Sequence, residues 1–174
     1  MRYGCLNKLV KSIRLTYPVM RIIIADDSPK EYTYDIDDEY VTYYRMPEYA
    51  GWNAGRGLVI SQVETEYFVW CDDDFVFTEN TNLPAFLSII ETSGYDVIGG
   101  GVGMNHLNAW RSYAKLKIEK GTFEEGFCIK REKGFYGTLP GFANCAVVDL
   151  IANFYIARTD TAAQARMFIV ELNS

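Results

Sequence analysis

The sequence predicts an α/β fold in which helices pack on a mostly parallel sheet. Helical spacing of apolar residues alternates with short β-branched or aromatic runs through the first hundred of the 174 residues, and this alternation is typical of parallel sheets covered by helices. The short runs are apolar throughout, as expected of strands buried on both faces. Acidic residues directly follow two of the runs, at the strand ends where open α/β sheets bind ligands.

A helix and two strands are expected first. Apolar residues recur at helical spacing from Leu6 to Ile13, and Pro18 ends that helix. The β-branched run over 21–25 predicts a strand, and 40–44 predicts a second short strand.

Asp26 and Asp27 follow the first of these strands. One interpretation is that a carboxylate accepts a hydrogen bond from the imide N–H of a pyrimidine ring. The other is a turn ahead of Pro29, which needs no ligand.

A glycine-rich segment over 51–57 opens the next predicted helix, which continues to residue 63. Glycines let a backbone approach a ligand closely. Arg56 falls in the first turn, where its guanidinium and the backbone N–H groups could hold a phosphate. The spacing matches neither the P-loop nor the dinucleotide-binding pattern.

Three aspartates, Asp72, Asp73 and Asp74, follow a predicted buried strand over 67–71. Adjacent carboxylates repel one another, and a divalent cation such as Mg²⁺ or Mn²⁺ offsets that cost when it is shared with a substrate diphosphate. In an extended chain Asp72 and Asp74 point to the same face, so one could bind the metal while the other contacts a ribose or the metal's water shell. The alternative is a solvated acidic turn or a helix N-cap, which the apolar residues on both sides disfavour.

The next predicted elements are a helix that Asn82 caps and Gly94 ends, and a strand over 96–102. Gly100 and Gly101 lie at the end of that strand, where they allow either close approach of a ligand or a plain turn. The second half is less regular. It predicts strands over 110–118, 127–131, 144–149 and 153–157, and a helix over 161–172.

Composition narrows the function classes. With 23 acidic and 17 basic side chains, the chain has a formal charge of -6 and no overall attraction to nucleic acid. It contains no apolar run long enough for a transmembrane helix. Cysteine spacing disfavours a zinc site but leaves open a disulfide between Cys128 and Cys145 or free thiols. His106 is the only histidine, which disfavours Ser-His-Asp chemistry.

Four blocks of this sequence resemble the β-1,4-N-acetylgalactosaminyltransferases, relatives of the family 2 glycosyltransferases, in both order and spacing. The blocks are IIADDS (23–28), GWNAGR (51–56), YFVWCDDDFVF (67–77), and GFANCAVVD (141–149) with NFYIARTD (153–160). The resemblance covers most of the chain. It implies a GT-A, Rossmann-like fold, with a mixed, mostly parallel sheet and flanking helices.

The same resemblance implies a UDP-sugar donor, UDP-N-acetylgalactosamine first, and dependence on Mn²⁺ or Mg²⁺. Asp74 would bind the metal and Asp72 the ribose or the metal shell, with Asp73 beside them. Asp26 or Asp27 would meet uracil, and Arg56 the uracil or the diphosphate. Independently of the resemblance, Gly100 and Gly101 would either lie close to the donor sugar or form a plain turn.

Family members transfer the sugar with inversion to a glycan or glycolipid acceptor in the Golgi lumen. By comparison with them, this chain is expected to be one glycosyltransferase domain, 1–174, incomplete at both ends. Residues 1–104 would form the donor-binding half and 105–174 a partial acceptor half. The family's expected base region is not recognisable, so Asp149 is the fallback candidate.

Two alternatives to an active transferase stay open. One is a nucleotide-sugar-binding module without the base. The other is a nucleotidyltransferase, which the lack of a glycine- and lysine-rich N-terminal loop disfavours.

Overall fold

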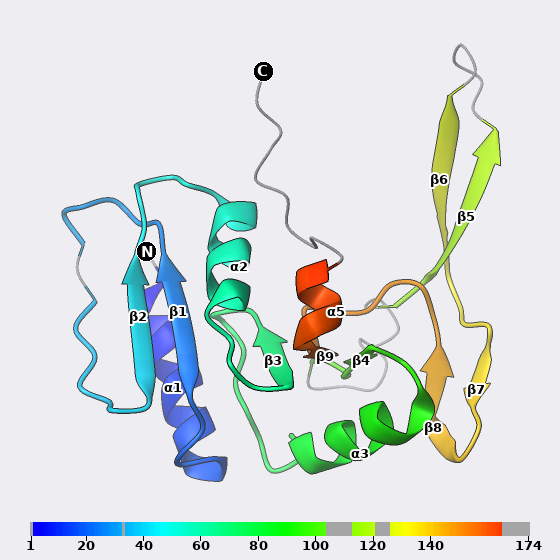
Figure 1. Ribbon diagram of the computed structural model, residues 1–174, viewed down its shortest axis with the longest axis horizontal. Coiled ribbons are helices and arrows are strands. Elements are labelled where there is room, and N and C mark those ends of the chain that lie inside the picture. Colours follow the sequence, from blue (N-terminus) through cyan, green and yellow to red (C-terminus); the bar gives the residue numbers. More distant parts are fainter. Residues whose placement is uncertain (1, 33, 104–112, 121–125, 165–174) are drawn as a thin grey trace. The chain divides into compact units, whose positions relative to one another are not determined.

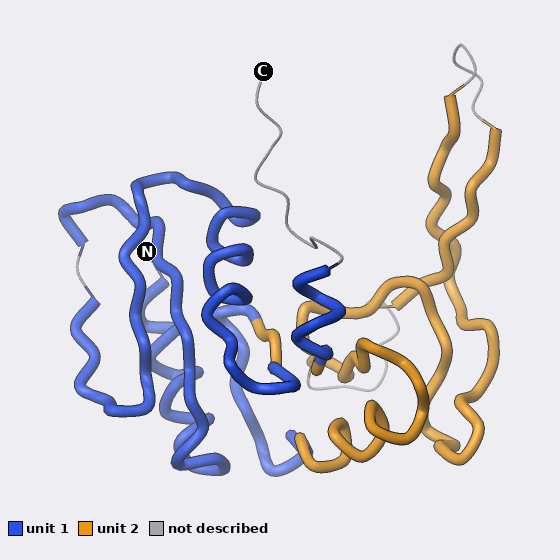
Figure 2. The backbone as a smooth tube through the Cα atoms, in the orientation of Figure 1, with its two compact units in different colours: residues 1–68, 72–82, 157–174 blue, residues 69–71, 83–156 orange. Residues whose placement is uncertain are grey.

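The computed structural model describes residues 2–32, 34–103, 113–120 and 126–164 (Figure 1). In these residues helices mix with parallel and antiparallel strands, which confirms the predicted α/β class. The chain forms two compact units (Figure 2). Unit 1 comprises 1–68, 72–82 and 157–174, and unit 2 comprises 69–71 and 83–156.

Unit 1 begins with helix α1 (Tyr3–Thr16), whose buried face consists of Leu6, Leu9, Val10, Ser12 and Ile13. Strands β1 (Ile22–Asp26) and β2 (Val41–Arg45) pair in parallel along their full lengths. Helix α2 (Trp52–Ser61) follows, and α5 (Thr159–Gln164) contacts it. These positions confirm the first predicted helix, the two strands and the helix after the glycine-rich segment.

The apolar strands are less enclosed than their composition suggests. Strand β1 is half-buried along its length apart from the buried Asp26, and β3 (Tyr67–Cys71) is half-buried throughout. The described strands form one sheet of three and three sheets of two rather than a single wide sheet. Fewer neighbouring strands leave more of each apolar strand uncovered.

Unit 2 holds most of a three-stranded sheet in the order β3-β9-β4, where β9 is Phe154–Arg158 and β4 is Val97–Gly99. Helix α3 (Leu83–Ser93) precedes Gly94, whose φ of 74° confirms its predicted place at the helix end. Strand β4 is shorter than the predicted 96–102.

Two antiparallel hairpins complete unit 2. The first joins β5 (Lys115–Lys120) to β6 (Phe127–Glu132), and the second joins β7 (Gly137–Leu139) to β8 (Phe142–Val147). Sequence patterns did not predict β7. The predicted positions 104–112, including His106, and the end of the predicted helix over 161–172 lie outside the described residues.

None of the described helices is long and apolar enough to cross a membrane. Cys128 and Cys145 are free thiols, as are the other two cysteines.

Candidate functional site

The three aspartates form a turn directly after β3. The backbone N–H of Phe75 donates to the carbonyl of Asp72 at 3.3 Å. Asp73 Oδ1 and Asp74 Oδ2 lie 2.7 and 2.6 Å from the same guanidinium nitrogen, Nη2 of Arg2. The turn therefore brings the carboxylates of Asp73 and Asp74 to one positive charge.

The electrostatics of the turn show the expected repulsion. Burial raises the pKa of Asp73, the Arg2 guanidinium opposes that rise, and the carboxylates of Asp74 and Asp72 add to it. A negative charge at Asp73 is thus costly in this environment, and a nearby cation offsets part of the cost.

The turn fits a divalent cation that a ligand would complete. Among the described residues, no group of three or more His, Cys, Asp or Glu side chains is placed to hold a metal alone. Mg²⁺ in nucleotide sites usually takes only one or two carboxylates and completes its shell with substrate phosphates and water. Asp73 and Asp74 already supply two carboxylates around one cationic group.

Asp26, at the end of β1, is a buried hub with 8% of its surface exposed. Its Oδ2 accepts hydrogen bonds from the hydroxyls of Tyr3, at 2.7 Å, and Tyr43, and from Arg45 at 3.1 Å. Its Oδ1 accepts from the backbone N–H of Ser28 at 2.9 Å. Burial raises the pKa of Asp26, but the hydrogen bonds from Ser28, Tyr43 and Tyr3 outweigh it and lower the pKa to about 2.

Arg45 extends this hub into the loop after β1. Its guanidinium donates to the carbonyl oxygens of Ser28, of Pro29 at 2.8 Å and of Tyr32 at 3.0 Å. One buried carboxylate and one guanidinium therefore fix the loop that follows the strand. These contacts of Arg45 were hard to predict from the sequence, because Arg45 and its partners come from separate segments of the chain.

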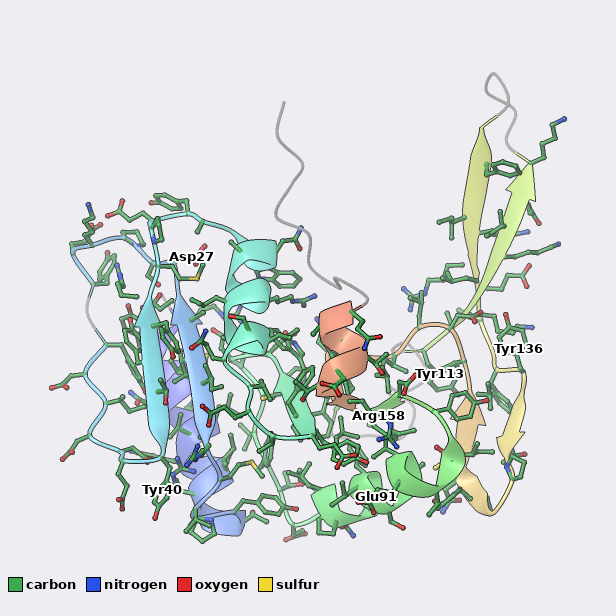
Figure 3. The ribbon with its side chains drawn as sticks, viewed as in Figure 1. Asp27, Tyr40, Glu91, Tyr113, Tyr136 and Arg158 are labelled. Carbon is green, nitrogen blue, oxygen red and sulfur yellow. The ribbon has the colours of Figure 1, made fainter. Side chains whose placement is uncertain are left out.

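Asp27, labelled in Figure 3, is half-buried and differs from its neighbour. Its Oδ2 accepts a hydrogen bond from the N–H of Gly51 at 2.9 Å, and its carbonyl accepts one from Tyr49. Gly51 is the N-cap of α2, with a φ of 87° that favours glycine. The carboxylate thus meets the positive end of a helix.

Arg56 lies on α2 with its guanidinium over the ring of Trp52, 4.6 Å from the centroid. Trp52 is 69% exposed, so the ring that stacks with Arg56 lies at the protein surface. Spacing of four residues on a helix brings two such side chains together, and an arginine stacks well on an indole. The sequence contained this spacing, but Trp52 was not predicted as a site residue.

The remaining predicted residues lie in unit 2. Gly100 donates its N–H to the carbonyl of Phe154 at 2.8 Å, and a Cβ there would lie 2.6 Å from ring atoms of both Phe86 and Phe154. Packing alone therefore requires glycine at this position. Gly101, which follows, is exposed.

Asp149 lies at the base of the β5–β6 hairpin. Its Oδ2 accepts hydrogen bonds from the N–H of Leu116 at 2.7 Å and from the hydroxyl of Tyr136 (Figure 3) at 2.6 Å. These two bonds lower the pKa of Asp149. A carboxylate with a lowered pKa is a weak base.

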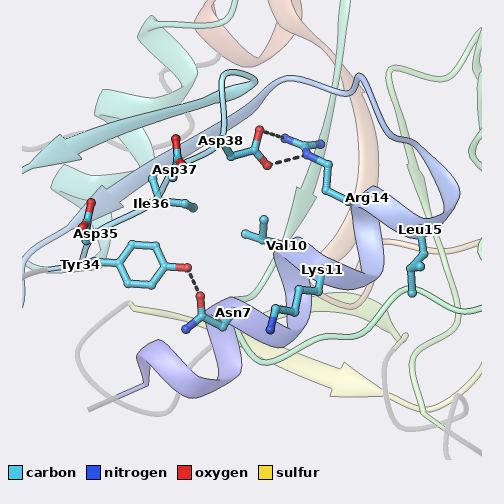
Figure 4. Close-up of a pocket in the computed structure, with 10 residues that line it drawn as sticks. All are labelled: Asn7, Val10, Lys11, Arg14, Leu15, Tyr34, Asp35, Ile36, Asp37 and Asp38. Atoms are coloured by element: carbon cyan, nitrogen blue, oxygen red, sulfur yellow. Dashed lines mark hydrogen bonds and ion pairs between the residues drawn. The ribbon is translucent and has the colours of Figure 1, made fainter.

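Unit 1 also contains a pocket of about 520 Å³ between α1 and residues 34–38 (Figure 4). None of the predicted site residues lines it. Arg14 pairs there with Asp38 at 2.7 and 3.1 Å, and Asn7 accepts a hydrogen bond from Tyr34. A second cavity of about 490 Å³ borders the Asp26 hub. It is lined by Lys30, Tyr34, Tyr43 and Arg45.

An α/β fold with strand-end carboxylates around a single cationic group fits proteins that bind nucleotide-linked substrates. The chain matches the profile of Glycosyl transferase family 2 over residues 2–148 and belongs to that family, which implies a GT-A, Rossmann-like fold.

Its relatives include the beta-1,4 N-acetylgalactosaminyltransferase 1 of Rattus norvegicus, which is 43% identical over 164 residues, or 94% of this chain and 30% of that protein. The human protein of the same name is 41% identical over 160 residues, 92% of this chain and 30% of that protein. The beta-1,4 N-acetylgalactosaminyltransferase 2 of Mus musculus is 38% identical over 155 residues, 89% of this chain and 29% of that protein.

These matches confirm the resemblance that the four sequence blocks indicated. The chain spans about 30% of the length of these relatives. No solved structure matches it significantly.

Proposed function

We propose that this chain is the donor-binding part of a glycosyltransferase that binds a UDP-sugar together with Mn²⁺ or Mg²⁺. The observation that carries the proposal is the convergence of the Asp73 and Asp74 carboxylates on one guanidinium nitrogen. UDP-N-acetylgalactosamine is the first candidate donor, because the relatives' names contain that sugar.

Within the turn, Asp74 binds the cation directly, since its side chain is the more exposed, at 49% against 39% for Asp73. Asp72 contacts the ribose or the cation's water shell, and Asp73 completes the negative environment. A divalent cation bound there would neutralise charge on the diphosphate and so stabilise the departing UDP. Arg2 vacates the two carboxylates when the cation arrives.

The base of the nucleotide lies near the end of β1. Asp26 or Asp27 was predicted to meet uracil, and we favour Asp27 because Asp26 already accepts four hydrogen bonds. The cavity with Tyr34 and Tyr43 on its wall supports this placement, because aromatic rings stack well on a nucleobase.

Arg56, held on Trp52, contacts the uracil or the diphosphate. Gly100 and Gly101 lie beside the donor sugar. We further propose that the sugar passes with inversion to a glycan or glycolipid acceptor, in the Golgi lumen.

Inverting transfer requires a base that deprotonates the acceptor hydroxyl. Asp149 is a weak candidate, because hydrogen bonds from Leu116 and Tyr136 occupy it and lower its pKa. That observation favours a second candidate function for this chain, a module that binds the nucleotide sugar without transferring it.

Titration calorimetry of UDP with and without Mn²⁺ tests donor binding, and UDP release from UDP-N-acetylgalactosamine in the presence of glycan acceptors tests transfer. We expect Asp74→Asn to weaken Mn²⁺-dependent UDP binding by about tenfold or more, the loss typical of a metal-site change. The matched control is Glu79→Gln, an exposed acid on the same segment.

Binding with turnover supports the transferase, and binding without turnover supports the module. UDP binding that is insensitive to both Mn²⁺ and Asp74→Asn would overturn both functions.

A further inference from the structure

The β5–β6 hairpin has two chemically different faces. Cross-strand partners in an antiparallel ladder point to the same side. One face carries the charged side chains that form ion pairs, among them Lys117 with Glu119 at 3.0 Å. The opposite face, called here the apolar face, is made of the partners Leu116 with Arg131, Ile118 with Ile129, and Lys120 with Phe127.

The apolar face is open to solvent. Ile118 and Ile129 are each 71% exposed, and Phe127 is 76% exposed. Within unit 2 the hairpin extends away from the other elements (Figure 1). Strand alternation of apolar and charged residues is typical of a sheet with one covered face, and an isolated two-stranded hairpin is only marginally stable in water. The apolar face therefore lacks a covering layer within the described part of the chain.

The charge of the hairpin differs in sign from that of the whole chain. Strands β5 and β6 carry five basic and two acidic side chains, a net charge of +3, whereas the chain as a whole carries -6. Glu124 and Glu125, in the connecting segment outside the described residues, leave the total positive. Of these side chains, Lys120 and Arg131 lie on the apolar face, and none of the acidic side chains of the two strands does. Because charges more than about 8 Å away are largely screened at physiological salt, a surface that approaches the apolar face meets mainly positive charge.

We propose that the apolar face of the β5–β6 hairpin docks onto a lipid bilayer whose head groups are anionic. Ile118, Ile129 and Phe127 enter the interfacial region, and Lys120 and Arg131, at opposite ends of the face, meet the head groups. Apolar residues flanked by lysine and arginine are the combination that binds such interfaces.

A second copy of the chain is a poorer occupant. A two-fold contact through this face would set each copy's patch against the same patch of the other. Lys120 and Arg131 of the two copies would then approach like charges, which disfavours the contact. The proposal is independent of the donor-binding function, because it uses none of the proposed site residues.

The test is co-sedimentation of the 174-residue chain with large vesicles, either of phosphatidylcholine alone or mixed with phosphatidylserine. We expect stronger binding to the mixed vesicles and weaker binding as salt is raised. Phe127→Ser should reduce the partition coefficient about tenfold, as expected for losing one inserted aromatic side chain. Leu15→Ser is the matched control, because Leu15 is 88% exposed but lies on α1 in unit 1.

A charge reversal, Lys120→Glu, tests the electrostatic attraction to anionic head groups without altering the apolar residues. It should abolish the preference for mixed vesicles, whereas Lys8→Glu, with the same change in net charge, should keep it. Circular dichroism checks that each variant is folded.

Absence of vesicle binding would overturn the proposal, as would equal losses from Phe127→Ser and Leu15→Ser. So would concentration-dependent dimers, measured by sedimentation velocity without lipid, that Phe127→Ser dissociates, because a second copy would then be the occupant.

Discussion

Asp26→Asn should destabilise unit 1 by about 2 kcal/mol at neutral pH. The pKa of Asp26 falls from 3.8 to about 2 on folding, because hydrogen bonds from Ser28, Tyr43 and Tyr3 outweigh the effect of burial. Each pKa unit corresponds to about 1.4 kcal/mol, so a shift of nearly two units gives the expected loss. In a domain of this size the melting temperature should fall by about 4–8 °C.

The pH dependence follows from the sign of the shift. The folded state has the lower pKa, so the contribution of Asp26 is fully present above about pH 4 and is lost as the pH falls through about 2. Urea denaturation, followed by tryptophan fluorescence at several pH values, measures it for both proteins. The difference between wild type and Asp26→Asn should be constant near neutrality and shrink below pH 4.

Asp27→Asn is the matched control. Asp27 is the adjacent residue, and its carboxylate accepts one backbone hydrogen bond, from the N–H of Gly51. One such bond contributes about 1 kcal/mol, so this variant should cost clearly less. Equal urea midpoints for wild type and Asp26→Asn at pH 7 would refute the reasoning. A difference that stays undiminished down to pH 2.5 would show that the loss comes from packing rather than from charge.

Three further outcomes are expected. Burial and the bond to Asp26 raise the pKa of Tyr43 to about 12, so the ultraviolet titration of wild type minus that of Tyr43→Phe should show one phenol with a midpoint near 12. Gly100→Ala should cost about 1–3 kcal/mol in urea denaturation, because its Cβ would overlap two aromatic rings, whereas Gly137→Ala, which meets nothing within 4 Å, should cost less. Arg2→Gln should tighten Mn²⁺ binding a few-fold in electron paramagnetic resonance titrations, because an exposed ion pair contributes up to about 1 kcal/mol and its loss frees the carboxylates.

Local patterns predicted most of the helices and strands. The strand over 67–71 has the predicted bounds, and α1 extends the predicted helix by one turn or less at each end, because apolar spacing and a proline stop act within one segment. Strand β7, of three residues, was missed, since so short a strand shows no periodicity. The degree of burial of β1 could not be predicted either, because it depends on how many strands lie beside it.

The candidate site was predictable in its residue types and less so in its contacts. The acidic turn and the Arg56 segment stood out because their residues are adjacent in the sequence. The hydrogen-bond and ion-pair partners of the carboxylates could not be predicted, because Arg2, Tyr43 and Arg45 reach the strand ends from distant positions in the sequence.

Asp26 and Asp74 occupy equivalent places, each at or just after the end of a strand, and a sequence pattern cannot separate them. Three side-chain donors and a backbone N–H meet Asp26, so its charge is satisfied inside the protein. Within the described part of the chain, the ion-pair partner of Asp74 is the exposed guanidinium of Arg2, which it shares with Asp73. A carboxylate paired with an exposed guanidinium can exchange it for another cation more easily than a buried carboxylate that accepts four hydrogen bonds. The number of donors, rather than the position on the strand, therefore makes Asp26 part of the scaffold and supports the acidic turn as the proposed ligand-binding segment.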